Sequence, residues 1–478
     1  MKPALPVLLI AGLVAGCSTA PKYVRPALPA PAVVTAGLAA GPKSPSAGNI
    51  AQPADVAWRD FFTDERLRSV IALSLEQNRD LRIAMANVAQ ARALYRVERA
   101  NLIPTVAASG SASFERTPGA VAGNRAAAGA ATGAVETDLY RAGVGVSAWE
   151  IDLFGRVRNL TESAQQAYFA SEANRDAART ALIAEVASAW LTLAAEEDRL
   201  QIARDTAATF GETLAITRGR AGEGVASDLE VRQAQTSYDQ ARSDIAAATT
   251  AVAQAENALD LLVGASVPDA LRPHALGVRD VTLAALPADL PSSVLLRRPD
   301  VVAAEHQLKA ANADIGAARA AFFPTISLTT ALGAVSPELS GLFKGGSDFW
   351  SVAPSASVPL LDFGRNRGNL RYAEATRDAK AAAYEKTVQT AFREAADALA
   401  RRATMDQQLD AQVSLADNAA AAHRIAEARY TEGVDPFLTT LDSQRTLYAA
   451  QQSLLATRLT RQINAVELYR ALGGGLLR

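Results

Sequence analysis

Two glycine-containing turns hold the residues of this 478-residue chain whose types and spacing suggest chemistry. Each turn joins two helical segments and gathers carboxylates and arginines within a few positions. Carboxylates that symmetry repeats around a pore mouth form a ring that attracts cations and holds a constriction. The candidates for such a gate are Asp228, Glu230, Tyr430, Asp435 and Asp442, and the turns themselves contain Arg220, Gly222, Gly224, Arg429 and Gly433.

Some of these carboxylates also have a simpler structural explanation. Asp228 and Glu230 lie at the start of a helical segment, where the helix dipole favours negative charge. A gate ring and an ordinary helix cap therefore explain these two residues equally well. Asp442 lies further inside its helical segment, where capping does not explain it.

Cys17, the only cysteine, follows Ala15-Gly16 at the end of a short apolar run that begins after Met1-Lys2. Such a run is typical of an N-terminal signal peptide. The small residues before Cys17 resemble a bacterial lipobox, in which the cysteine is acylated and the chain is cut before it. We therefore expect lipidation of Cys17, and Ser18 favours the outer membrane under the sorting rules for such lipoproteins. The alternative is that Cys17 is an unmodified, inert small residue within the apolar run.

Most other classes of chemistry lack support. The three histidines are widely spaced, with no carboxylate at a recognised ligand spacing, so we expect no metal site. Asp362-Phe363-Gly364 matches the metal-binding triplet of protein kinases, but the phosphate loop and catalytic loop of a kinase are missing, and a cap and turn into a helix explain it better. No other catalytic motif is present, so we expect no enzyme and no cofactor. A net charge of −2 argues against nucleic acid as a partner.

An internal duplication supplies the elements that position these residues. The upstream matches are 220 positions apart and the downstream matches 209, so the length change falls between Pro104 and Phe154. There the Gly/Ala-rich residues 119–135 read as a loop. The matched pairs include Pro104 with Pro324, Phe154 with Phe363, Gly155 with Gly364, Arg156 with Arg365, and Gly224 with Gly433.

Four segments alternate between apolar and polar residues with period two, at residues 106–115, 140–148, 326–333 and 350–360. Their length suits a tilted membrane strand of about 9 to 11 residues. Strands in a bilayer must close into a barrel, and known barrels begin at about 8 strands. One chain supplies only four, so two, three or four copies of the chain must pool their strands into one barrel. The alternative is two soluble hairpins packed on helices.

Each strand pair is followed by a very long helical segment, at residues 156–218 and 365–430, and then by an antiparallel helical partner, at 227–263 and 436–472. At about 1.5 Å per residue, the long segments reach roughly 95 Å. Shorter helices are expected at residues 64–99 and 298–321, and a proline-rich extended tether precedes them. The pattern predicts a long tube wall made of helix pairs, with an ordinary coiled-coil stalk as the alternative.

Nearly the whole mature chain resembles TolC-like outer-membrane efflux proteins of the NodT-type lipoprotein subfamily. The resemblance implies a trimer with a 12-stranded outer-membrane β-barrel, a periplasmic α-helical barrel, and turns that dock a periplasmic adaptor serving an inner-membrane pump of the RND type. It also implies an aspartate ring at Asp442 and a bond from the Tyr430 hydroxyl to a carboxylate of the neighbouring helix pair, for which Glu230 is the candidate. It rests on Cys17 with Pro21-Lys22-Tyr23; Trp58 with Phe61-Phe62; Arg297-Arg298-Pro299-Asp300; Phe323-Pro324; Asp362-Phe363-Gly364-Arg365; and Arg429-Tyr430 through Leu441-Asp442.

The resulting hypothesis is a passive, gated exit duct for small molecules, held in the outer membrane by lipid and extending into the periplasm. A duct for protein secretion is the nearest alternative, and a trimeric surface stalk or adhesin is a more distant one. The expected organisation is a signal peptide at residues 1–16, a lipidated tether at 17–60, a first repeat at 61–264, an equatorial linker at 265–292, a second repeat at 293–473 and a tail at 474–478.

Overall fold

Segments from both repeats combine in each of the two compact units of the chain. The computed structural model describes residues 19–27, 33–34, 56–118, 134–277, 281–282 and 290–474. Cys17 and nearly all of the loop expected at 119–135 lie outside these described residues. The first unit comprises residues 1–26, 89–170 and 305–382, and the second unit comprises 27–88, 171–304 and 383–478.

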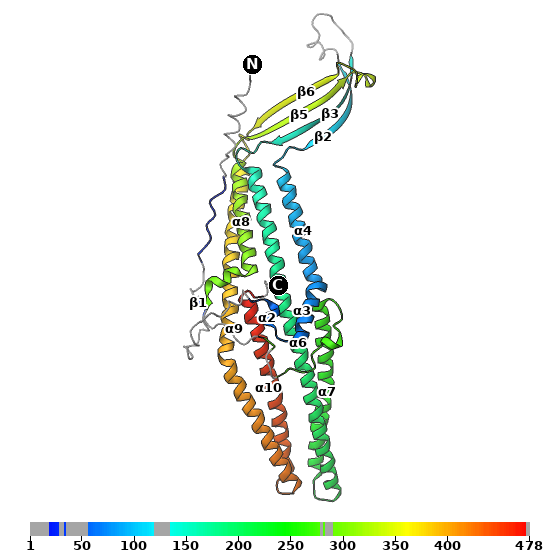
Figure 1. The fold of residues 1–478 in the computed structure, drawn as a ribbon, viewed down its shortest axis with the longest axis vertical. Helices are drawn as coiled ribbons and strands as arrows, with labels where there is room; N and C mark the ends of the chain where they lie inside the picture. The colour runs from blue at the N-terminus through cyan, green and yellow to red at the C-terminus, as the bar shows by residue number, and fades with distance from the viewer. Residues whose placement is uncertain are drawn as a thin grey trace, which may run out of the picture. The chain divides into compact units, whose positions relative to one another are not determined.

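All four expected strands are present, and they form one antiparallel sheet in the first unit (Figure 1). The central pairing joins the two hairpins, because the second strand of the first hairpin pairs with the first strand of the second. The outer edges of the sheet have no further strand partner among the described residues. The strands, in their order across the sheet, are β2 (Val106–Thr117), β3 (Val135–Glu150), β5 (Thr325–Ser336) and β6 (Asp348–Ser357).

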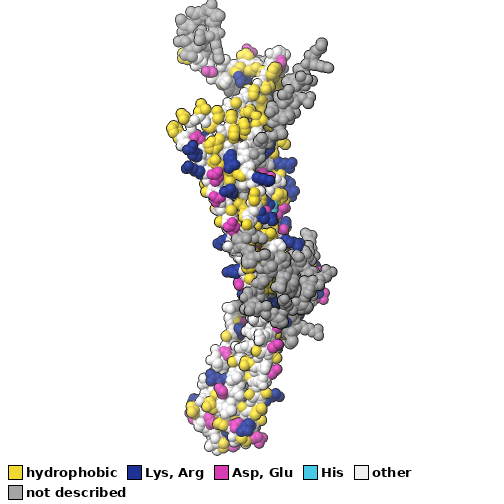
Figure 2. All heavy atoms as spheres, turned by 90° about the vertical axis from the view of Figure 1, so that its left-hand side faces the viewer, with side chains coloured by type: hydrophobic (Ala, Val, Ile, Leu, Met, Phe, Trp, Pro, Cys, Tyr) yellow, Lys and Arg dark blue, Asp and Glu magenta, His cyan; other side chains and the backbone are white. Residues whose placement is uncertain are grey.

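Both faces of the two edge strands are exposed, although these strands carry large apolar side chains. In β2 every residue except the last is exposed, and Phe114 and Trp350 expose 68% and 76% of their surface. Figure 2 shows hydrophobic side chains gathered toward the strand end of the first unit, with charged side chains over its helices. Soluble hairpins packed on helices would cover one face, so that alternative is wrong.

A bulge in β3 was not expected from the alternating pattern. The register between β3 and β5 shifts between Val146 and Trp149, and Ala148 adopts a positive φ of 49°. An extra residue of this kind bends a strand and increases its twist. Gly143 and Gly333 lie opposite each other nearby, and a Cβ on Gly333 would overlap the carbonyl oxygen of Ala142.

Parts of four helices accompany the sheet among the described residues of the first unit, and the two longest begin at capped turns. Asp152 and Asp362 each accept a backbone hydrogen bond from the first turn of the following helix, at 2.8 and 2.9 Å, and for Asp362 this is the expected cap. Glycines with positive φ precede both starts. These helices are α4 (Arg79–Ala100), α6 (Arg156–Gly222), α8 (Pro299–Ala320) and α9 (Arg365–Thr431).

The N-terminal segment that the structure describes is fastened along α8. The Thr19 hydroxyl donates to the carbonyl oxygen of Gly316 at 2.7 Å, and the Arg25 guanidinium donates to Glu305 at 2.6 Å. Burial by itself would raise the pKa of Glu305, but hydrogen bonds from Arg25 and Lys309 outweigh it and hold that pKa below the usual 4.5. This part of the expected tether is therefore a strap with specific partners.

In the second unit each long helix turns back into an antiparallel partner (Figure 1). The partners are α7 (Asp228–Val263) and α10 (Phe437–Ala471), which begin and end within one or two residues of the expected positions. One stretch of α6 is apolar enough and long enough to cross a membrane, but 56% of it is buried inside the protein. That burial is typical of a helix in a protein core.

The helix expected from residue 64 to 99 is two helices. Asp64 caps α3 (Glu65–Gln77), because its carboxylate accepts hydrogen bonds from the backbone amides of Arg66 and Leu67. At Asn78 the backbone is extended, and its side chain bonds Leu81 N at 2.7 Å and Leu262 O at 2.8 Å. The bond to Leu262 comes from a distant helix, so the local pattern did not reveal the break.

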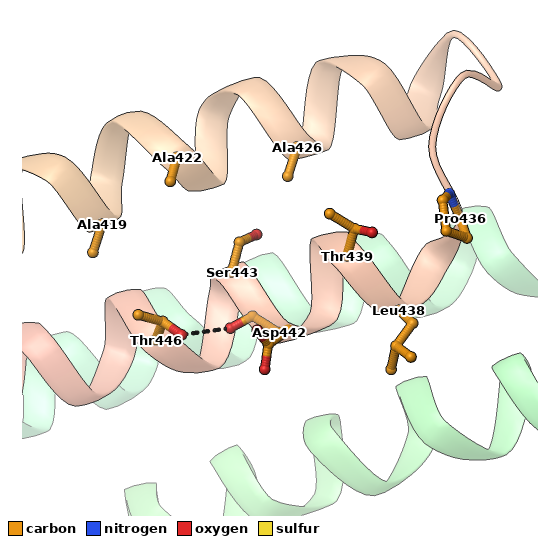
Figure 3. Close-up of a pocket in the computed structure, with 9 residues that line it drawn as sticks. All are labelled: Ala419, Ala422, Ala426, Pro436, Leu438, Thr439, Asp442, Ser443 and Thr446. Carbon is orange, nitrogen blue, oxygen red and sulfur yellow. Dashed lines mark hydrogen bonds between the residues drawn. The ribbon is translucent and has the colours of Figure 1, made fainter.

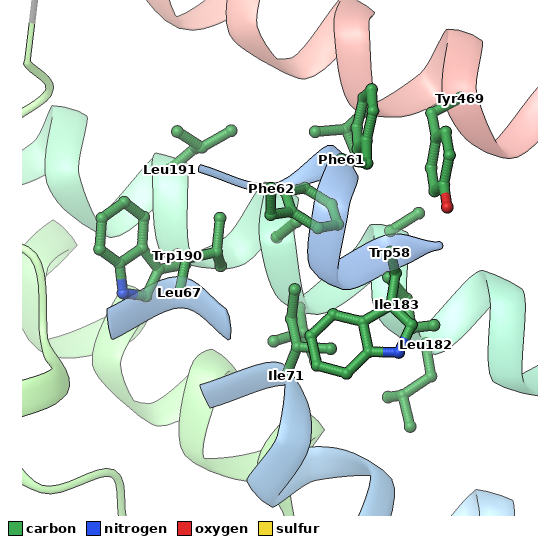
Figure 4. Packing of buried hydrophobic residues seen from close by; sticks show 14 of the residues in the cluster. Trp58, Phe61, Phe62, Leu67, Ile71, Leu182, Ile183, Trp190, Leu191 and Tyr469 are labelled. Carbon is green, nitrogen blue, oxygen red and sulfur yellow. The ribbon is translucent and has the colours of Figure 1, made fainter. Parts of the chain in front are cut away.

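A large apolar core in the second unit surrounds the short helix α2 (Trp58–Phe61) (Figure 4). Trp58 exposes only 2% of its surface, and Phe61 stacks on Tyr469 of α10 with ring centroids 3.9 Å apart. The expected boundary between tether and repeat at residue 60 therefore falls inside a core helix. The remaining short elements are β1 (Val33–Val34), paired with β4 (Leu290–Pro291), and η3 (Asp269–Leu271), η4 (Ser292–Arg297) and η5 (Leu339–Gly341).

Candidate functional site

Arg220 and Tyr430 join the two helix hairpins of the second unit at their turns. The Arg220 Nη1 donates to the carbonyl oxygen of Tyr430 at 2.9 Å, and its guanidinium lies 4.7 Å from the centroid of the Tyr430 ring. The Tyr430 hydroxyl lies 3.3 Å from the Thr217 hydroxyl. We call these three residues the tip latch, because the two hairpins cannot separate here without breaking its contacts.

An apolar cluster supports the tip latch. Tyr430 is 5% exposed, and its ring packs edge-on against Phe437, with centroids 5.7 Å apart. The remaining members come from both hairpins, so the ring of Tyr430 is held in a fixed place for Arg220 to cover. They are Ala207, Phe210 and Leu214 of α6, Ala234 and Ala241 of α7, and Leu441 of α10.

The second turn is closed by an ion pair within its own hairpin. Arg429 Nε and Nη2 donate to the two carboxylate oxygens of Asp435 at 2.6 and 2.8 Å. The hydrogen bond from Arg429 is the main cause of a pKa of Asp435 below its usual range. Gly433 and Gly224 both have φ of +75°, which favours glycine, and so the two turns share one backbone shape.

The structure places Glu230 in a helix cap. Its carboxylate accepts from the backbone amide of Ser227 at 2.6 Å, while the Ser227 hydroxyl accepts from the amide of Glu230, which is a complete capping box. The expected bond from Tyr430 to Glu230 is therefore wrong within the chain, since Thr217 takes that place. Asp228 lies beside Arg232 at 3.5 Å, one turn along the same exposed helix face.

Asp442 lies on the exposed side of α10, beside a groove of about 620 Å³ between α9 and α10 (Figure 3). Three alanines of α9 face this groove, and the Asp442 carboxylate points away from them. Its backbone carbonyl accepts from the Thr446 hydroxyl at 2.9 Å. The carboxylate itself has no hydrogen-bond or ion-pair partner among the described residues.

Sequence reasoning missed the polar contacts that hold α10 to the first hairpin. Gln444 donates to the Thr213 hydroxyl at 2.9 Å in a buried position, and the Tyr448 hydroxyl donates to Asp244 at 3.0 Å. Burial and then the bond to Asp244 raise the pKa of Tyr448 to about 12. Positions of this kind fall on ordinary helix faces, and no spacing rule marks them.

The described residues include no group of three His, Cys, Asp or Glu side chains able to hold a metal ion. His423, near the groove, lies 3.3 Å from the Ser443 hydroxyl and 3.8 Å from Glu427. Its burial lowers its pKa. His423 therefore serves as a buried polar contact between α9 and α10.

Comparison with known proteins agrees with this arrangement of open-edged sheet, long helices and paired tips. A family model described as outer membrane efflux protein matches residues 70–265 and 290–474. The chain belongs to the outer membrane efflux protein family. It is therefore a transport channel protein of the outer membrane, and it is built on the mixed β-barrel and α-helical barrel fold from two repeats of strand pair and long helices.

The similarity extends over nearly the whole chain. The solvent efflux pump outer membrane protein SrpC of Pseudomonas putida is 43% identical over 463 residues, which cover 97% of this chain and 96% of SrpC. The outer membrane protein OprJ of Pseudomonas aeruginosa is 41% identical over 477 residues, 99% of this chain and 96% of OprJ. The chain therefore matches these relatives over nearly their whole length.

Solved structures agree. A membrane protein from Pseudomonas aeruginosa superimposes with a TM-score of 0.87 at 40% identity, over 96% of this chain and 98% of that one. The open state of the Neisseria gonorrhoeae MtrE outer membrane channel gives a TM-score of 0.82 at 38% identity, over 97% and 99% of the two chains. The fold of this chain is therefore that of an outer-membrane channel.

Proposed function

We propose that this protein is the passive, gated exit duct of a tripartite efflux system. Three copies pool their strands into a 12-stranded barrel, and a periplasmic adaptor connects their helix tips to an inner-membrane pump of the RND type. Acylated Cys17 holds each copy in the outer membrane. The open edges and exposed faces of the four-stranded sheet support this assembly, because an unclosed sheet leaves backbone groups unpaired in a bilayer.

The gate lies at the helix tips. The tip latch of Thr217, Arg220 and Tyr430 keeps the two hairpins of a copy together in the closed state. Asp442, exposed beside the groove of α9 and α10, forms a carboxylate ring when three copies surround one axis. Opening separates the hairpins, and the energy for this movement comes from the partners. The duct itself binds no cofactor.

The cargo consists of small toxic compounds. SrpC is named for solvents, and the relative ArpC of Pseudomonas putida, 43% identical over 476 residues, for antibiotics. Relatives with such different cargoes share this whole chain, so the pump, more than the duct, selects the substrate. Asp435 and Arg429, together with the glycine turns at Gly222, Gly224 and Gly433, present the surface on which the adaptor docks.

Photocrosslinking from the tip in living cells tests this function. Val434 is suited to a photoreactive amino acid because it is 61% exposed, whereas the neighbouring Gly433 has a positive φ that disfavours any side chain. Phe343, 85% exposed in the connection between β5 and β6, is the matched control. We expect Val434, and not Phe343, to capture the adaptor of a small-molecule pump.

The captured protein also separates the alternatives. An adaptor from an ATP-driven protein exporter would assign the duct to secretion and overturn the proposal for small molecules. Absence of any adaptor at Val434, with the protein correctly inserted in the outer membrane, would contradict a role as a duct. In that case the photoreactive group at Phe343 identifies a stalk, because an adhesin would be linked to extracellular partners at this position.

A further inference from the structure

The first compact unit has two open flanks, formed by the same parts of the two repeats. Across the sheet the order is β2-β3-β5-β6, so β2 and β6 are the edges. The helices have a matching order at their strand-proximal ends. The α6 helix contacts α4 through Thr161 and Glu98 and α8 through Asn159 and Gly316, while α9 contacts α8 through Asn366 and Ala321. The sides of α4 and α9 that face away from α6 and α8 belong to the two open flanks.

One aromatic contact marks the junction between the two repeats inside the chain. Phe154, in the turn that leads into α6, stacks on Phe323, which follows α8, with ring centroids 4.6 Å apart and planes inclined by 14°. Phe154 follows the end of β3 and Phe323 precedes the start of β5, so the contact adjoins the ends of these two paired strands. It therefore fastens the first repeat to the second where strands become helices.

The internal duplication gives both residues a counterpart. Phe154 corresponds to Phe363 at the spacing of 209, and Phe323 corresponds to Ile103 at the spacing of 220. Within the chain these counterparts are far from buried, since Phe363 is fully exposed and Ile103 is 69% exposed. Phe363 also has a φ of +53°, a left-handed conformation that is unusual for a bulky residue.

A second crossing repeats the relation. A Cβ on Gly316 of α8 would come within 2.5 Å of the Asn159 side chain of α6, so this crossing requires one small residue. The duplication relates Asn159 to Gly368 of α9 and Gly316 to Arg96 of α4. At Gly368 an added Cβ meets nothing within 4 Å. Each of these two related residue pairs thus contains one glycine. The space beside Gly368 is not filled within the chain.

We infer that Phe363 of one copy packs on Ile103 of the neighbouring copy, and that Gly368 leaves room there for Arg96 of that copy. This inference rests on the proposed trimer and names its seam. The internal junction of repeats then recurs between copies: β6 pairs with the neighbouring β2 as β3 pairs with β5, and α9 lies beside the neighbouring α4 as α6 lies beside α8. Burial in that seam compensates the strained backbone of Phe363.

A photoreactive phenylalanine analogue tests the contact. Placed at Phe363 of the full-length protein in the outer membrane, it should link to a peptide containing Ile103 and convert monomer bands into dimer and trimer bands on denaturing gels. The same analogue at Phe343 is the control and should give no linked bands. Adducts of Phe363 with lipid, or links confined to its own chain, would overturn the inference.

A charge placed at the seam gives a second test. Gly368→Arg has open space within one chain but would meet Arg96 of the neighbour, and we expect at least a tenfold loss of trimer relative to Gly345→Arg. Gly345 is the matched control because its Cβ also meets nothing within 4 Å. Native mass spectrometry separates the failures: a trimer that resists Gly368→Arg and lacks the Phe363 link refutes this seam, whereas a wild-type monomer refutes the proposed assembly itself.

Discussion

Replacing Arg220 by alanine should open the channel more often than any other single change in the tip latch. Arg220 makes two contacts to the second hairpin, the hydrogen bond to the Tyr430 carbonyl at 2.9 Å and the guanidinium over the Tyr430 ring at 4.7 Å. The Tyr430 hydroxyl makes only one, at 3.3 Å from Thr217, which is long for a bond between hydroxyls.

The expected magnitudes follow from these contacts. A hydrogen bond from a charged donor contributes about 1.5 to 3 kcal/mol, and a cation–π contact at an exposed site about 0.5 to 1 kcal/mol. Arg220 is only partly buried, so the lower ends apply, and the loss is about 2 kcal/mol per copy. Because about 1.4 kcal/mol corresponds to a factor of ten, Arg220→Ala should shift the closed–open equilibrium of each copy roughly 25-fold. Tyr430→Phe, which loses about 0.5 kcal/mol, should shift it about twofold.

Single-channel recording in planar bilayers measures this shift as open probability. Arg218→Ala is the matched control, because Arg218 lies on the same helix and bonds Gln235 within its own hairpin. The control should behave like the unmodified protein. Equal open probability for Arg220→Ala and Arg218→Ala would refute the tip latch, and so would a larger effect of Tyr430→Phe than of Arg220→Ala.

The remaining predictions concern four other positions. Asp442→Asn should lower the preference for cations, seen as a reversal potential closer to zero under a salt gradient; an unchanged value would remove Asp442 from the pore. Cys17→Ser should lose the acyl mass in intact-protein mass spectrometry, and a retained acyl group would disprove the lipidation site. Since the pKa of Glu305 is lowered in the fold, its ion pairs support the strap fully above pH 4.5 and weaken as the pH falls through the lowered pKa; hydrogen exchange of residues 19–26 should rise only in that acidic range. Asp435→Ala frees Arg429 to reach the neighbouring copy and should lower the open probability, and an increase would contradict the idea that Asp435 restrains Arg429.

The sequence predicted those parts of the fold that depend on long repeating patterns. Period-two alternation located all four strands, and the partner helices α7 and α10 begin and end within one or two residues of expectation. The duplication made these assignments stronger, because every element was seen twice. The paired caps at Asp152 and Asp362 were also predictable, since carboxylates before a helix start satisfy free backbone amides.

Features set by distant contacts could not be predicted. Asn78 ends α3 while bonding the carbonyl of Leu262, and Thr217 takes the Tyr430 hydroxyl expected at Glu230. The bulge near Ala148 in β3 depends on its pairing with β5. The sequence located the two turns that join the paired helices. The capping box of Ser227 and Glu230 depends on local geometry, and it holds the Glu230 carboxylate within its own turn.

The duplication finally explains why the two hairpins are latched within a copy. Arg220 and Arg429 are counterparts at the spacing of 209, and so are Ala226 and Asp435. Arg220 has alanine at the position where Arg429 has a carboxylate, so it reaches across to the next hairpin in its own copy. Arg429 would reach toward the neighbouring copy by the same geometry, but Asp435 holds it within its own hairpin. We therefore expect closure to depend on the latch within each copy, and Arg429 to add a contact between copies only when Asp435 is removed.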